Sequence, residues 1–231
     1  MVSRLRDDLG ITRIAVLYQD DSFGRAGYQG AKRALASYDM EPVSVGLYPR
    51  NTVAVKTALL DLSRGNPEAV ILVGAYEPVA ALISWAKFIG LDAVFIAISF
   101  VGSNAMAEEL GSDGAGVFVT QVVPFPQDDS RPVVRAYHQA LAAFDPGASP
   151  GFVSLEGYLA GRLAAAALES CGREVSRECF LDRFSSPEAI DLDGFKLYFG
   201  PGDNQGSDQV FLTAIGEDGR YRSIFSLRDI R

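Results

Sequence analysis

The sequence predicts an α/β fold in which one lobe is a doubly wound parallel sheet and a second, partial lobe is mainly helical. Two observations carry this prediction. Short runs such as residues 69–74 and 94–98 are apolar throughout, as expected of strands buried on both faces. Amphipathic segments separate these runs, which is the alternation of a parallel sheet covered by helices. From residue 131 onward the alternation stops, and helical patterns dominate.

The first strand–helix pair is the clearest. Residues 13–18 predict a buried strand, 19–24 a loop, and 25–38 a helix that either Asp21 or Ser22 caps. The first half then continues with further strands and helices, and the proline pair at 124 and 126 ends it. The other strands predicted in this half are 42–48, 69–74, 94–98 and 117–123, and the other helices are 53–63, 78–90 and 105–110.

In the second half we expect three helices and hardly a buried strand. The helices are 132–144, 153–171 and 176–184, followed by an extended segment at 194–199. A turn-rich stretch, 200–207, then leads to a hairpin that begins with 210–215 and has its tip at 217–220. The second of these helices carries an apolar stripe that must be buried, and this half supplies no sheet to cover it. The stripe is Val153, Leu155, Tyr158, Leu159, Leu163, Ala166, Ala167 and Leu168.

Charge and hydrophobic pattern exclude several classes of function. The formal net charge of −8 argues against nucleic acid and anionic membranes as partners. The apolar runs are far shorter than the roughly 20 residues that cross a bilayer. The first nine residues mix both charge signs with helical apolar spacing and lack the order of an export signal, so either the protein stays inside the cell or its beginning has been removed.

We find no catalytic constellation, and we expect no enzyme activity, cofactor or metal. Phosphate-binding glycine loops and nucleophile motifs are absent, and Asp20 and Asp21 have no third ligand nearby for a cation. Two cysteines, Cys171 and Cys179, are too few for a disulfide scaffold. Two ordinary thiols are the default interpretation, and a local bridge is the alternative in an oxidising compartment.

Several segments together resemble the type I periplasmic binding proteins of the branched-chain amino-acid transporter class. Each match is weak alone, but their order and spacing cover nearly the whole chain. They are 14–24 (IAVLYQDDSFG), 73–78 (VGAYEP), 86–91 (AKFIGL), 99–102 (SFVG), 122–126 (VVPFP), 154–161 (SLEGYLAG) and 206–212 (GSDQVFL).

The resemblance implies two doubly wound lobes, three crossings between them and a ligand held in the cleft. Set against that plan, the sequence begins at the first helix of the second lobe and lacks the opening sheet of the first. Residues 1–122 and 208–231 then correspond to the complete C-terminal-type lobe, and 127–200 to the helical part of the N-terminal-type lobe. Hinges are expected near 123–126 and 200–208.

Ligands of open parallel sheets bind beyond the carboxyl ends of the strands, so three loops are candidates for the site. By resemblance, Phe23 presents an aromatic ring to the ligand and Tyr76 lines the site, whereas Phe23 as core and Tyr76 as a packed loop aromatic are the alternatives. The candidate ligand-binding residues are Asp21, Ser22, Phe23, Tyr76, Glu77, Ser99 and Phe100.

One position departs from the amino-acid binders of the family. Those proteins place an acidic residue where this chain has Ser99 or Phe100, and neither side chain neutralises an ammonium group. Aromatic walls with the hydroxyls of Tyr76 and Ser99 suit an aromatic acid or another ligand with a large apolar surface. Glu77 is a substitute cation partner, against the alternative that it only complements a helix dipole.

We therefore expect capture of a small solute, an amino acid, aromatic acid or related compound, for delivery to the membrane permease of an ABC transporter. The resemblance places such a protein in the periplasm or another extracytoplasmic compartment. The alternatives are a sensory input domain of the same fold and, more remotely, a flavodoxin-like or glycosyltransferase-like enzyme. Exposed apolar helix faces also predict a homo-oligomer.

Overall fold

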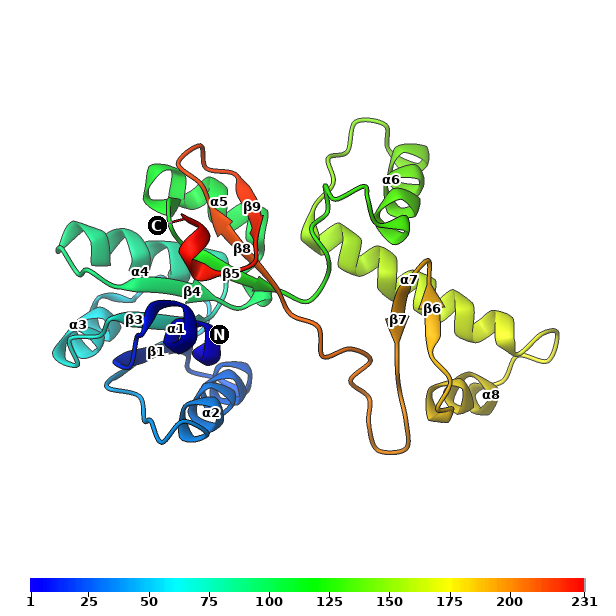
Figure 1. Cartoon of the computed structure of the whole chain (residues 1–231), viewed down its shortest axis with the longest axis horizontal. Coiled ribbons are helices and arrows are strands. Elements are labelled where there is room, and N and C mark those ends of the chain that lie inside the picture. Colours follow the sequence, from blue (N-terminus) through cyan, green and yellow to red (C-terminus); the bar gives the residue numbers. More distant parts are fainter. Residues whose placement is uncertain (231) are drawn as a thin grey trace. The chain divides into compact units, whose positions relative to one another are not determined.

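The computed structural model describes residues 1–230, and the chain divides into two compact units. Unit 1 consists of residues 1–121 together with the C-terminal segment that begins at Phe211. Unit 2 is the stretch between them, Val122–Val210. Figure 1 labels the helices and strands of both units.

A sheet of seven strands forms the centre of the described part of unit 1, in the order β2-β1-β3-β4-β5-β8-β9. The first five in chain order pair in parallel, and the last two add an antiparallel hairpin at the edge. The strands are β1 (Ile14–Gln19), β2 (Val45–Tyr48), β3 (Ala69–Val73), β4 (Val94–Ala97), β5 (Phe118–Gln121), β8 (Phe211–Ile215) and β9 (Tyr221–Ile224). The doubly wound sheet predicted from the sequence is confirmed, with this antiparallel edge added.

Helices cover both faces of the sheet. Alternate residues of β3 divide between the two faces: Val70 and Leu72 join one buried cluster, and Ile71 joins the other. The first cluster includes residues of α3 (Lys56–Arg64), α4 (Tyr76–Phe88) and α5 (Ser103–Leu110). The second includes residues of α1 (Val2–Leu9), α2 (Ser22–Ala36) and the 3-10 turn η4 (Leu227–Ile230). Strands buried on both sides explain the continuous apolar runs of the sequence.

Two helices that carry candidate site residues, α2 and α4, begin earlier than the sequence predicts, so these residues lie in helical turns. The helix α2 begins at Ser22 instead of residue 25, because the Asp21 carboxylate accepts a hydrogen bond from the Gly24 N–H at 2.9 Å and caps it. The helix α4 begins at Tyr76 instead of residue 78. Pro78 is tolerated there because the first-turn N–H groups of a helix have no intrahelical partner.

Unit 2 is built mainly from helices. They are α6 (Pro132–Phe144), α7 (Phe152–Ser170), α8 (Arg177–Asp182) and the 3-10 turn η3 (Arg183–Ser185). Two short strands, β6 (Ile190–Leu192) and β7 (Phe195–Leu197), form an antiparallel hairpin. The strand β7 lies within the extended segment expected at 194–199, whereas β6 was not expected. Asp193 and Gly194, both with positive φ, make the turn of the hairpin, and Ile190, Leu192 and Phe195 are buried.

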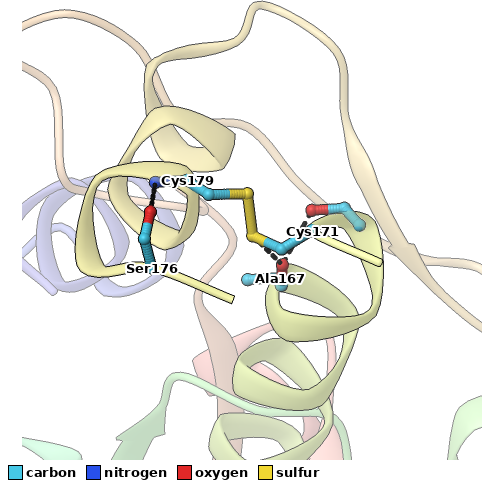
Figure 2. Close-up of a disulfide and its surroundings, with 5 residues drawn as sticks. Ala167, Cys171, Ser176 and Cys179 are labelled. Atoms are coloured by element: carbon cyan, nitrogen blue, oxygen red, sulfur yellow. Dashed lines mark hydrogen bonds between the residues drawn. A yellow bond between two sulfur atoms is a disulfide. The ribbon is translucent and has the colours of Figure 1, made fainter. Parts of the chain in front are cut away.

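The two cysteines form a disulfide that connects the end of α7 to α8. Cys171 and Cys179 are eight positions apart in the sequence, and Figure 2 shows the bridge between their helices. Ser176 caps α8, because its hydroxyl oxygen accepts the Cys179 N–H at 3.1 Å. The alternative of a local bridge, rather than two free thiols, is therefore the one that the structure adopts.

Candidate functional site

The topology of unit 1 defines one edge of its sheet as the place for a ligand. The chain order reverses between β1 and β3, since β2 lies on the far side of β1. In open parallel sheets, ligands bind outside the carboxyl ends of the strands at such a reversal. The segments that follow β1, β3 and β4 at this edge, each a short loop and the first helical turn after it, carry all seven candidate residues.

The loop after β1 is fixed by Asp21. One oxygen of its carboxylate caps α2, and the other accepts a hydrogen bond from Gln19 Nε2 at 2.6 Å. The pKa of Asp21 is lowered below its usual value, mainly by the hydrogen bond from the Gly24 N–H. Burial acts in the opposite direction, and the hydrogen bond from Gln19 and the charge of Arg50 lower the pKa further. Only glycine fits at position 24, because an added Cβ would lie 1.8 Å from the Gln19 carbonyl oxygen. Asp21 is thus occupied in shaping the loop.

Two aromatic rings from different loops meet at this edge. The ring centroids of Phe23, in the first turn of α2, and Phe100, in the 3-10 turn η1 (Ser99–Val101), are 4.2 Å apart with an angle of 40° between the planes. Phe23 is half-buried and also packs on the core. A role in the core and a ring presented to a ligand therefore do not exclude each other for this residue. Phe100 is 63% exposed, which leaves most of its surface available to a ligand.

Tyr76 and Glu77 lie next to each other in the first turn of α4. The Tyr76 hydroxyl donates to Glu77 Oε1 at 3.3 Å. The negative charge of Glu77 and this hydrogen bond raise the pKa of Tyr76, with smaller contributions from burial and from Glu109. The Tyr76 ring also lies near the loop after β4, since a Cβ added to Gly102 would be 3.9 Å from it.

Of the seven candidates, the structure thus brings together two separate pairs. Phe23 contacts Phe100, and Tyr76 is hydrogen-bonded to Glu77. Ser22 is exposed in the first turn of α2, and Ser99 is half-buried at the start of η1.

A buried polar chain behind the loops was not predicted from the sequence. The hydroxyl of Tyr48, at the end of β2, donates to Gln19 Oε1 at 3.4 Å. Burial raises the pKa of Tyr48 to about 12, and a hydrogen bond from the Ala75 backbone acts in the opposite direction. Gly74 leaves room for this phenol, because a Cβ there would lie 2.2 Å from the Tyr48 oxygen. The ends of three neighbouring strands are therefore tied to one hydroxyl.

An open hollow of about 730 Å³ lies beside this polar chain. It extends the candidate site to the loop between β2 and α3, which the sequence did not single out. Its lining residues are Gln19, Asn51, Thr52, Val53, Ala54, Ala75, Glu77 and Pro78.

Both chain connections to unit 2 start at the same edge of the sheet. Gln121, the last residue of β5, pairs with Phe211, the first residue of the antiparallel strand β8. The chain thus leaves unit 1 and returns to it beside the carboxyl ends of β1, β3 and β4.

Among residues 1–230, no group of three or more His, Cys, Asp or Glu side chains is arranged to hold a metal ion. Within the same range, every helix is too short or too polar to cross a membrane. A contoured surface of aromatic, amide and carboxylate groups suits binding.

The chain belongs to the periplasmic binding protein family, whose model matches residues 1–220. Proteins of this family are in general extracytoplasmic and do not catalyse reactions. The comparison with curated proteins gives no match.

Solved structures agree with this assignment. A possible leucine/isoleucine/valine-binding protein from Rhodopirellula baltica SH 1 is 36% identical, with a TM-score of 0.91 over 100% of this chain and 63% of its own. A substrate-binding periplasmic protein from Ralstonia solanacearum is 26% identical, with a TM-score of 0.85 over 95% of this chain and 63% of its own. The chain thus spans a little under two thirds of the length of both structures.

Proposed function

We propose that the carboxyl edge of the unit 1 sheet binds a small solute with a substantial apolar surface, and that the protein delivers this solute to an ABC transporter. The observation that carries the proposal is the contact between Phe23 and Phe100 at the reversal of strand order. Their loops are far apart in the sequence, and the contact gives the edge an exposed aromatic surface.

The polar groups at the same edge support a solute that also carries hydrogen-bonding groups. Tyr76 and Glu77 present a hydroxyl and a carboxylate, and Gln19 is held in place through Tyr48 and Asp21. Sites for small molecules commonly combine apolar walls with a few fixed polar groups. Amino acids with apolar side chains, aromatic acids and related compounds match this combination.

The similar proteins support the same class of solute and the same role. The Rhodopirellula baltica protein is described as possibly leucine/isoleucine/valine-binding. A putative branched-chain amino acid ABC transporter protein from Rhodospirillum rubrum shares the fold at 21% identity, with a TM-score of 0.75. For this chain we propose hinges at residues 123–126 and 200–208, near the two ends of unit 2.

The disulfide supports a location outside the cytoplasm. Bridges such as Cys171–Cys179 persist in oxidising compartments and are rare where glutathione keeps thiols reduced. We propose that the protein works in the periplasm or an equivalent extracytoplasmic space.

A thermal-shift screen of the 231-residue chain tests the proposed function. Because a ligand that binds only the folded state stabilises it, millimolar amino acids, aromatic acids and small amides with apolar bodies are expected to raise the melting temperature. Phe100→Ala is expected to abolish the shift. Phe88→Ala is the matched control, since Phe88 is 81% exposed in unit 1 and ends α4, whose opposite end carries Tyr76 and Glu77.

Two results would contradict the proposal. One is the absence of any shift across the screen. The other is a shift that survives Phe100→Ala and disappears with Phe88→Ala, which would place the ligand elsewhere on unit 1.

A further inference from the structure

The helix α4 carries an apolar stripe on the face that points away from the sheet. The inward face of this helix is buried in the first cluster of unit 1 through Val79, Leu82, Ile83 and Ala86. The outward stripe has the same spacing, displaced by two residues or about 200° around the helix. It consists of Ala81, Ser84, Trp85, Phe88 and, directly after the helix, Ile89. A helix that is apolar on opposite faces is typical of one covered on both sides.

The neighbouring helix α3 widens this apolar surface (Figure 1). The ammonium nitrogen of Lys56 lies 3.9 Å from the centroid of the Trp85 ring. Leu60 follows Lys56 by four residues on α3, so it shares the same side of the helix, and it is 61% exposed. Phe88 is 81% exposed, and its ring meets that of Trp85 edge-on, with 5.6 Å between the centroids. We call the surface formed by the outward stripe and Leu60 the α4 face.

The two ammonium groups beside the α4 face already have partners within the chain. The Lys87 ammonium donates hydrogen bonds to the backbone oxygens of Asp113 and Ala115, at 2.5 and 3.1 Å. The Lys56 ammonium lies over the Trp85 ring. Burial of a charge is costly where it loses its partners. Since both groups keep theirs, covering the α4 face mainly removes apolar surface from water.

The α4 face combines an exposed ring with room for another ring. The small side chains of Ala81 and Ser84 leave an open hollow of about 530 Å³ between the stripe and the 3-10 turn η2 (Gly111–Gly114). This volume exceeds that of a phenyl ring. The small residues of the stripe lie toward the start of α4, whereas the large residues Trp85 and Phe88 lie toward its end.

We propose that the α4 face binds the same face of a second copy of this chain, with the two α4 helices antiparallel about a two-fold axis between Ser84 and Trp85. A two-fold interface requires a surface that is complementary to itself. In this register, Phe88 lies opposite Ala81 of the second copy, and Trp85 lies opposite Ser84 of the second copy. Large side chains therefore meet small ones, as close packing requires. A parallel pairing would instead oppose the two Phe88 rings and leave the small residues without contacts.

The dimer is expected to be weak and reversible. Only a few side chains of each copy take part, whereas stable complexes use about 20–30 residues a side. The α4 face lies toward the end of α4 opposite Tyr76 and Glu77, so the dimer leaves the carboxyl edge of the sheet open. The inference is independent of the proposed function. Phe88→Ala remains a control for solute binding, because the thermal shift compares one variant with and without solute.

Sedimentation velocity of the 231-residue chain from about 10 µM to 1 mM tests the surface. A reversible monomer–dimer equilibrium is expected. Phe88→Ala should weaken it about 30-fold, since buried aromatic residues carry much of the energy of an interface. Phe225→Ala is the matched control and should stay within about 2-fold, because Phe225 is 87% exposed and precedes η4 on the other face of the sheet. A chain that stays monomeric throughout, or a dimer that survives Phe88→Ala, overturns the proposal.

Cysteine cross-linking tests the antiparallel register. Both cysteines of the chain are bridged to each other, so Ser84→Cys introduces its one free thiol, next to the proposed axis. A short bismaleimide suits this position, because packed helix axes lie about 8–10 Å apart, too far for a direct disulfide. At least about 10-fold more cross-linked dimer is expected than with Ser37→Cys, which places an exposed thiol at the end of α2. Equal yields from the two variants would overturn the pairing even where a dimer forms.

Discussion

The two units of the chain bury their apolar side chains in different ways. Unit 1 places a wide sheet in the centre, and helices cover both of its faces, so both large buried clusters lie there. In the described part of unit 2, the only paired strands are the three-residue strands β6 and β7. Its longest helix, α7, buries Leu155 and Leu159 but leaves Val153 68% exposed.

Unit 2 compensates for its small core with covalent and polar connections. The disulfide ties α8 to α7, and the Arg162 guanidinium joins Tyr158 of α7 to Asp193 in the turn between β6 and β7. The difference teaches that loops are held in fixed positions where the strands before them are buried on both faces. Unit 1 meets this condition at the carboxyl ends of its strands.

Truncating one leucine in each unit compares the two cores directly. Leu72, fully buried in the central strand β3, is expected to cost about 3–5 kcal/mol of unfolding free energy when replaced by alanine. Leu159→Ala in α7 is expected to cost about 2 kcal/mol, because the thinner core around it relaxes more easily. Urea unfolding followed by circular dichroism measures both, and equal losses would contradict the contrast.

Reducing the disulfide is expected to destabilise unit 2 alone. Opening the short loop between Cys171 and Cys179 costs about 2–3 kcal/mol in the chain-entropy account. Hydrogen exchange with and without reductant should show faster exchange in α7 and α8 and no change in the sheet of unit 1. A double Cys171→Ser, Cys179→Ser variant is the control, since reductant should leave it unaffected.

The ion pair between Arg162 and Asp193 connects α7 to the hairpin of unit 2. Arg162→Met is expected to lower the free energy of unfolding by about 0.5–1 kcal/mol, because the pair is partly exposed to solvent. The segment of α7 around Tyr158 and the turn between β6 and β7 should become more mobile together. A lower melting temperature and faster hydrogen exchange in both segments would show this. Arg64→Met in unit 1, which removes a pair between two more exposed side chains, should change the stability hardly at all. Comparable losses in both variants would remove the special role of this connection.

Acid is expected to weaken the cap of α2 in unit 1. The pKa of Asp21 is lowered in the folded chain, so its ionised carboxylate contributes to the stability of the folded state at pH values above the ordinary pKa of aspartate. The contribution is lost as the pH falls through the lowered value. Asp21→Asn keeps a capping oxygen that does not titrate, so its melting temperature should depend less on pH between about 5 and 2. An unchanged pH dependence would contradict the assignment.

The sequence predicts the elements of the fold well where apolar periodicity decides them. The helix 132–144 coincides with α6, and each buried run of the first half contains a strand. Boundaries set by a single side chain were less accurate, as at Asp21 and Pro78. The extended segment predicted at 194–199 contains β7, but its partner β6 was missed, because a strand of three residues is too short for an alternation to be visible.

The arrangement of the candidate site could be read from the sequence only in part, for a physical reason. Strand ends identify the loops, so Phe23, Tyr76 and Phe100 follow from the order of elements. Tyr48 instead ends the predicted strand 42–48, where an aromatic residue is indistinguishable from ordinary sheet composition. Gln19 opens the predicted loop 19–24, and nothing in the local sequence marks it as a partner of Tyr48. Their role depends on the lateral order of β2, β1 and β3, which no local pattern contains.

The most direct test of the central claim is a map of ligand-induced chemical-shift changes on the backbone amides of the 231-residue chain. With the strongest compound of the thermal-shift screen, the account predicts changes concentrated in residues 19–24, 75–78 and 98–102. Changes confined to unit 2, or to the outer surface of α4 around Phe88, would contradict it.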